Sequence, residues 1–285
     1  MSEMCDNDYR LPFTYRVAEA ARWALRGPGT RMVYRSLLAP ALRRALSAAA
    51  PPSPTLVSVC GGQLKGFRLW VDLTCEKYYW LGVYEEHVQT LAATSVEAGA
   101  VVYDIGAHIG FFTVLFSRLS GQAGIVYAFE PLPQNIERLM ANIEVNSLAN
   151  VRARCVAVSD QEGSDTLVAR GSSLMAHLTK NSGEAAEGVI PVQTTTVDAM
   201  VSGGYRIPSL LKIDVEGAEG RVIRGAARTL QSYRPWIVLE IHSAQSAEEV
   251  IAALPVPYLI REIATGRKVN PPLVAGHYLL RPQDA

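Results

Sequence analysis

Short apolar runs alternate with amphipathic stretches from about residue 100 to the C-terminal end of the chain. The apolar runs predict buried strands over residues 101–103, 125–129, 151–158, 210–213, 235–241, 258–262 and 276–281. Stretches with apolar residues at helical spacing predict helices over residues 111–119, 134–146 and 218–232. Strands that alternate with helices indicate an α/β fold with a mainly parallel, doubly wound sheet.

The chain divides by pattern into three parts. Residues 1–54 predict an N-terminal helical extension with a Pro-rich linker, 55–98 a β-hairpin and an aromatic helical lead-in, and 99–285 a Rossmann-like domain. Arginines interleave with apolar residues in the extension, which favours a packed helical extension with a basic face over an arm that binds a membrane, a partner or a second subunit. A homo-oligomer formed through this extension stays open.

Composition narrows the classes of partner. The charges of the 27 basic and 27 acidic side chains cancel, so no overall electrostatic field favours the binding of nucleic acid. A small-molecule substrate is therefore expected. The 4 cysteines lack zinc-ligand spacing, and no apolar stretch approaches the roughly 18 residues of a membrane-spanning helix. We therefore expect a cytoplasmic protein without a transmembrane segment.

A glycine-bearing loop follows the first strand of the Rossmann-like domain. Gly106 allows the turn off the strand, and Gly110 allows a close helix start that leaves backbone N–H groups facing a ligand. The third glycine of the dinucleotide fingerprint and the Gly-Lys-Ser/Thr run of a P-loop are both missing, which disfavours a pyrophosphate. Asp104 suits a ligand with positive charge, and Glu130, at the end of the next strand, is placed to bind a ribose diol. This pattern predicts S-adenosylmethionine as the cofactor.

Further strand ends carry candidate site residues. Asp214 and Glu216 follow the strand over 210–213, while Glu240 and His242 share one face of the strand over 235–241. Asp214 alone is equally consistent with a helix N-cap. Two further groups of contacts are expected: Val158 and Ser159 against the adenine, and Tyr84 and Glu85, within an aromatic stretch, against the substrate.

Several segments together resemble the FkbM family of S-adenosylmethionine-dependent methyltransferases. They are VVYDIGAHIGFFT (101–113), AFEPLPQNIERLMANIEVN (128–146), VAVSDQEG (156–163), TTVDAM (195–200), LKIDVEGAEGRVIRGA (211–226) and PWIVLEIH (235–242). The resemblance implies a class I methyltransferase fold, with a mainly parallel seven-stranded sheet and one antiparallel strand. It also implies O-methylation of small molecules such as sugars or natural-product intermediates.

The residues expected to bind the cofactor are Asp104, Gly106, His108, Gly110, Glu130, Pro131, Val158, Ser159 and Asp214. The resemblance also bears on one of them, in the glycine loop. The family usually has Asn at the position of His108. An imidazole there still donates a hydrogen bond, but its protonation would make cofactor affinity depend on pH.

Methyl transfer to an alcohol benefits from a base, and the sequence offers two. His242 has the most suitable unperturbed pKa, with Glu240 to orient it, and Asp214 is the rival base. Glu216 is expected to contact the substrate. No metal is expected, although Asp214, Glu216, Glu240 and His242 are the residues that would hold a divalent ion.

Three other functions remain open. They are a catalytically inactive cofactor-binding module, a methyltransferase that acts on a nitrogen or carboxylate acceptor, and a nicotinamide-dependent oxidoreductase. Stabilisation of the protein by S-adenosylhomocysteine but not by NAD would argue against the last of these.

Overall fold

The computed structural model describes residues 54–169, 176–179 and 189–283. Residues 71–77 group with the N-terminal part of the chain up to residue 56, whereas residues 57–70 and 78–285 form a second compact unit. In the first unit, Asp72 Oδ1 accepts hydrogen bonds from the N–H (2.8 Å) and the hydroxyl (2.5 Å) of Thr74, which closes a turn. The predicted N-terminal extension lies outside the described residues, apart from Pro54.

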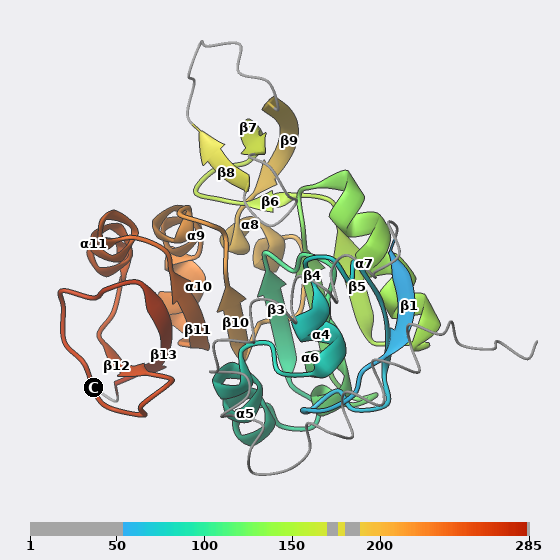
Figure 1. The fold of residues 1–285 in the computed structure, drawn as a ribbon. Helices are drawn as coiled ribbons and strands as arrows, with labels where there is room; N and C mark the ends of the chain where they lie inside the picture. The colour runs from blue at the N-terminus through green and yellow to red at the C-terminus, as the bar shows by residue number, and fades with distance from the viewer. Residues whose placement is uncertain (1–53, 170–175, 180–188, 284–285) are drawn as a thin grey trace, which may run out of the picture. The chain divides into compact units, whose positions relative to one another are not determined.

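A seven-stranded sheet forms the centre of the second unit, in the order β12-β13-β11-β10-β3-β4-β5 (Figure 1). The strands are β3 (Val101–Ile105), β4 (Ile125–Phe129), β5 (Val151–Arg154), β10 (Leu210–Ile213), β11 (Trp236–Ile241), β12 (Tyr258–Glu262) and β13 (Gly276–Pro282). Neighbouring strands pair in parallel except at β13, which runs antiparallel to both β11 and β12. The predicted mainly parallel, seven-stranded sheet with one antiparallel strand is confirmed.

One face of this sheet carries the main hydrophobic core. Successive side chains of a strand point to opposite faces, so Tyr103, Leu211 and Leu239 share a face with their neighbours two residues away. These side chains pack with buried residues of four helices, such as Leu230 and Val250. The helices are α8 (Val197–Ser202), α9 (Glu219–Gly225), α10 (Ala227–Tyr233) and α11 (Ala244–Ala253).

The alternate positions of the same strands carry charged side chains. Asp104 of β3 and Lys212 of β10 are direct partners in the parallel register, and both are buried. Asp104 accepts a hydrogen bond from Thr113 of α6 (Phe111–Ser120), and Lys212 Nζ lies 5.3 Å from the ring centroid of Phe112. This face of the sheet is therefore the one that α6 covers, and it presents charge in place of a purely apolar surface.

Further helices complete this part of the unit. They are α4 (Lys77–Leu81), α5 (Glu86–Ser95) and α7 (Pro133–Val145). Two short strands, β1 (Thr55–Ser58) and β2 (Arg68–Val71), pair in a two-stranded sheet. The backbone N–H of Trp70 bonds to Asn142 Oδ1 of α7 (2.6 Å), and the same Asn142 donates from Nδ2 to the carbonyl of Ile109 (2.8 Å). Asn142 of α7 thus links β2 to the glycine loop.

The part of the chain between β5 and β10 forms a four-stranded sheet, in the order β6-β9-β7-β8. It consists of β6 (Ala157–Val158), β7 (Gly163–Ala169), β8 (Ala176–Thr179) and β9 (Val189–Thr195). The strand predicted over 151–158 therefore ends at Arg154, because residues 157–158 pair with β9 and leave the central sheet. Leu167 and Val192 pack with Leu132 and Ala157 in a small apolar cluster.

Among the residues that the structure describes, none of the helices combines the length and apolar character needed to cross a membrane.

Candidate active site

An open cavity with about 600 Å³ of empty space lies at the carboxyl ends of β3, β4 and β10. The lining residues are Tyr79, Tyr84, Gly106, His108, Glu130, Pro131, Leu132, Asn135, Leu167, Asp214, Val215 and Glu216. Open parallel sheets bind ligands at this edge because the loops that follow the strands diverge there.

The glycine loop is shaped by one close backbone approach. Gly106 has φ +80°, and a Cβ atom built on it would lie 1.7 Å from the carbonyl oxygen of Asp214. Only glycine fits this conformation and this contact. The approach brings the loop after β3 against the loop after β10, so both line the same cavity.

His108, at φ +49°, also has a left-handed conformation. Asn, Asp and His are the side chains other than glycine that enter this region most readily, so the backbone here suits either the Asn usual in the family or the His of this chain. The ring Nδ1 of His108 lies 3.2 Å from the hydroxyl of Tyr79, whose own ring stacks on Phe111 at 5.2 Å. Aromatic side chains therefore support one wall of the loop.

Glu130 is held by neutral donors. Its Oε2 accepts the backbone N–H of His108 (2.9 Å), and its Oε1 accepts the N–H of Leu132 (3.0 Å) and Nδ2 of Asn135 (3.2 Å). Burial raises the pKa of the carboxyl group, and these hydrogen bonds oppose that shift. A carboxylate oxygen has two lone-pair sites, so Glu130 Oε2 can accept one further hydrogen bond.

A buried lysine joins two aspartates below the cavity. Lys212 Nζ donates to Asp214 Oδ2 (3.0 Å) and lies 3.8 Å from Asp104 Oδ1. Burial would lower the pKa of Lys212, but the two carboxylates outweigh it and raise the pKa. Asp214 shows the reverse: burial acts to raise its pKa, while Lys212 holds it below the usual value. Asp214 is thus ionised, with its charge largely compensated by Lys212.

His242 is surrounded by carboxylates. Its Nδ1 lies 2.7 Å from Glu219 Oε1, and its Nε2 lies 3.3 Å from Glu216, 3.6 Å from Glu240 and 3.7 Å from Asp214. Burial lowers the pKa of His242, but the hydrogen bond to Glu219 and the neighbouring charges raise it to about 9. An imidazole with that pKa is protonated near neutral pH and is a poor proton acceptor. The expectation that His242 is the base is therefore not supported by its surroundings.

The structure divides the predicted site residues into two groups. Gly106, His108, Glu130, Pro131, Asp214, Tyr84 and Glu216 line the cavity. The lining does not include Asp104, Gly110, Val158, Ser159, Glu85, Glu240 or His242, although all of these are described residues.

Four of the residues outside the lining have a clear physical reason for their place. Asp104 points to the α6 face and is fully buried. Gly110 lets α6 start against Leu139, because a Cβ atom built on Gly110 would lie 2.3 Å from the Leu139 side chain. Val158 and Ser159 belong to or follow β6 in the four-stranded sheet and are buried there. The predicted direct contacts of these residues with a cofactor therefore have no support in the cavity.

Three residues that matter here were not singled out from the sequence. Lys212 stands alone between apolar residues of β10, and a lysine inside a buried strand is the signal that would have pointed to it. Glu219 is two residues beyond a conspicuous loop, and His277 lies far along the chain. Strand register alone brings His277 opposite Glu240.

Comparison with known proteins gives concordant matches. Residues 104–263 match the family described as the Methyltransferase FkbM domain. The hexuronic acid methyltransferase AglP of Haloferax volcanii is 29% identical over 180 residues, which cover 63% of this chain and 71% of that protein. The 31-O-demethyl-FK506 methyltransferase FkbM of Streptomyces tacrolimicus is 29% identical over 208 residues, covering 62% of this chain and 79% of that protein.

A solved structure is also similar. The methyltransferase FkbM from Methylobacillus flagellatus KT is 16% identical, with a TM-score of 0.45. The match covers 74% of this chain and 51% of that one.

Proposed function

The chain belongs to the FkbM methyltransferase family, and on this premise we propose that it methylates a hydroxyl oxygen of a small molecule. Membership makes the chain a methyltransferase that depends on S-adenosylmethionine, and it confirms the resemblance read from the sequence motifs. The acceptor atom, the substrate class and the residue roles below are proposals.

One observation carries the proposal: a single cavity joins the glycine loop to a pair of acidic side chains. Gly106, His108 and Glu130 line one part of it, and Asp214 and Glu216 line another. Carboxylates suit a cofactor that carries an ammonium and a sulfonium, and Glu130 retains the acceptor capacity that a ribose diol needs. The residues present therefore fit S-adenosylmethionine, which supplies the methyl group when bound.

The acidic lining favours a hydroxyl over a carboxylate as the acceptor. A neutral hydroxyl can donate a hydrogen bond to Asp214 or Glu216, whereas a carboxylate acceptor has no proton to donate to either. The name of the Streptomyces tacrolimicus relative specifies an oxygen, and that of the Haloferax volcanii relative specifies a hexuronic acid. A hexuronic acid carries both hydroxyls and a carboxyl group, so the carboxylate acceptor remains the second candidate.

We assign proton acceptance to Asp214 instead of His242. Although Lys212 lowers the pKa of Asp214, the carboxylate is ionised and can accept the hydroxyl proton, because that proton becomes strongly acidic as the oxygen gains the methyl group. Asp214 lines the cavity, and its backbone is fixed against Gly106. His242 lies outside the lining and within 3.7 Å of both Asp214 and Glu216, so it acts as a positioning residue that holds these two carboxylates. Fixing the acceptor hydroxyl beside such a carboxylate contributes through orientation as well as through proton transfer.

The test uses S-adenosylmethionine labelled in its methyl group with a panel of sugars, hexuronic acids and hydroxylated macrocycles. We expect label in a product that survives mild alkali, because methyl ethers resist hydrolysis and methyl esters release methanol. Asp214→Asn should lower kcat by about 10²- to 10⁴-fold. The affinity for S-adenosylhomocysteine, measured on the same variant, separates this loss from weaker cofactor binding. Glu97→Gln, at an exposed position, is the control and should leave both unchanged.

Two results would contradict the proposal. Label that alkali releases as methanol would identify a carboxylate acceptor. Binding of S-adenosylhomocysteine without turnover on any acceptor of the panel would favour a cofactor-binding module without activity.

A further inference from the structure

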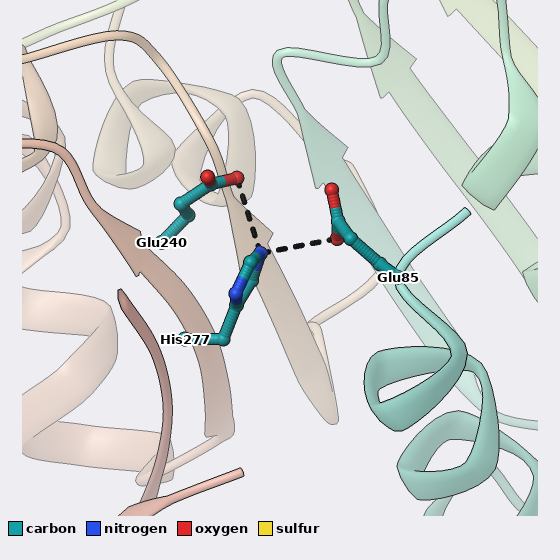
Figure 2. A group of neighbouring side chains, drawn as sticks. All are labelled: Glu85, Glu240 and His277. Carbon is teal, nitrogen blue, oxygen red and sulfur yellow. Dashed lines mark ion pairs between the residues drawn. The ribbon is translucent and has the colours of Figure 1, made fainter. Parts of the chain in front are cut away.

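Three side chains from separate parts of the chain meet beside the acidic end of the cavity. Glu85 directly precedes α5, Glu240 lies on β11, and His277 lies on β13 (Figure 2). His277 Nε2 is 3.2 Å from Glu85 Oε2 and 3.4 Å from Glu240 Oε2. One ligand atom from each residue can be chosen so that all three lie within 4.8 Å of one another.

Backbone structure fixes this meeting point. Glu240 and His277 are direct partners in the antiparallel register of β11 and β13, so their side chains share one face of the sheet. Glu85 has a left-handed conformation, with φ +42°, and its side chain does not cap α5. A non-glycine residue in this region costs free energy, so the rest of the fold holds Glu85 in place.

The ring nitrogen of His277 faces both carboxylates. His277 Nε2 is buried and forms ion pairs with one oxygen of Glu85 and one of Glu240, both within 3.4 Å. In Figure 2 this nitrogen lies between the carboxyl groups of Glu85 and Glu240, where the three groups surround one point.

Negative charge exceeds positive charge around this point. Glu240 is shared: its Oε2 faces His277, and its Oε1 lies 3.6 Å from His242 Nε2. The nearby cations are already engaged, Lys212 by Asp104 and Asp214, and the protonated His242 by Glu216 and Glu219. The carboxylates of this region are Glu85, Asp214, Glu216, Glu219 and Glu240. Partly buried carboxylates at this density favour a bound cation.

We propose that Glu85, Glu240 and His277 bind a divalent first-row transition metal ion. An imidazole nitrogen with two carboxylates suits Mn²⁺ or Zn²⁺ better than Mg²⁺ or Ca²⁺, which prefer oxygen ligands throughout. The ion would hold Glu85 and, through the backbone, the adjacent Tyr84, whose side chain lines the cavity. The site is thus a cation site that orders the cavity wall, at a position separate from the pair Asp214 and Glu216.

Manganese binding can be measured directly by electron paramagnetic resonance, because bound Mn²⁺ loses the sharp signal of the free ion. The full chain, freed of metal with a chelator and exchanged into buffer, is titrated with Mn²⁺. We expect one ion to bind with micromolar affinity. His277→Gln and Glu85→Gln should each weaken binding by about tenfold or more, since each removes one ligand.

The matched control is Glu86→Gln, which removes an exposed carboxylate next to Glu85 and should leave Mn²⁺ affinity unchanged. A tenfold excess of Mg²⁺ should not displace the bound Mn²⁺. Thermal unfolding of each variant establishes that it is folded before the titration. Two ligand variants are used so that the test still works if one of them does not fold.

Three outcomes would overturn the proposal. The first is no Mn²⁺ binding at millimolar concentration, which would leave the three residues as an ion-pair cluster with a protonated imidazole. The second is unchanged binding in both ligand variants. The third is binding that His242→Gln abolishes and His277→Gln preserves, because Asp214, Glu240 and His242 form a neighbouring group with ligand spacing. None of these outcomes depends on methyl transfer, so the proposed function would stand or fall separately.

Discussion

Two parts of the same sheet edge handle buried charge in opposite ways. At the ends of β3 and β4, Glu130 is held by backbone and amide donors that carry no charge. At the ends of β10 and β11, carboxylates are held by Lys212 and His242, which are cations. Neutral donors that the backbone fixes hold the Glu130 carboxyl group in one geometry. Carboxylates held by charged side chains can instead exchange protons or ions with a ligand. The first part is suited to hold a ligand, and the second to do chemistry on one.

Gly106→Ala should have the largest effect, because Gly106 is where these two parts touch. The new Cβ would lie 1.7 Å from the carbonyl oxygen of Asp214, so the loops must separate. We expect the free energy of unfolding to fall by about 4 kcal/mol or more in urea denaturation. Gly99→Ala is the matched control, since Gly99 has φ +86° but no atom within 4 Å of an added Cβ. It should cost only about 1–2 kcal/mol, and equal losses would show that backbone strain, not the contact, decides the result.

Lys212→Met should have the next largest effect, and it removes the charge compensation of the second part. Asp104 and Asp214 would lose their shared buried cation, which costs about 3–5 kcal/mol of unfolding free energy. Chemical denaturation measures this loss, and Lys65→Met, at an exposed position, should change stability little. Adding Asp104→Asn should recover part of the loss. A second substitution that makes the protein still less stable would argue against a charge effect.

Glu130→Gln should have the smallest effect on stability and a clear one on ligand affinity. The amide keeps the shape of the side chain but loses the charge that strengthens its hydrogen bonds. Calorimetry should show S-adenosylhomocysteine binding weakened by about 10- to 100-fold, which corresponds to one charge-assisted hydrogen bond. Glu137→Gln, exposed on α7, should bind as the parent chain does. Unchanged affinity in Glu130→Gln would remove Glu130 from the cofactor site.

Apolar runs were enough to predict the central sheet, because buried parallel strands are short and almost uniformly hydrophobic. The runs at 125–129 and 210–213 have the bounds of β4 and β10. The glycine loop was predicted for a similar local reason: its glycines are needed wherever the backbone turns or touches another loop.

The acidic end of the site was harder to predict, because it depends on contacts between distant residues. His277 lies opposite Glu240 only through the antiparallel register, which no local pattern encodes. The ionisation of His242 depends on Glu219 and Glu216, so its ordinary pKa was a poor guide. The strand predicted over 151–158 was too long for a similar reason, since residues 157–158 pair with β9, which lies well over thirty residues further along the chain.

Among the described residues, Leu167 of β7 is the cavity residue that the four-stranded sheet contributes. The wall that it forms is thus built by a module of its own, with its own strand pairing and its own small apolar cluster. Exchanging that module between relatives would change what fits against the wall, while the parts that seat the methyl donor keep their places.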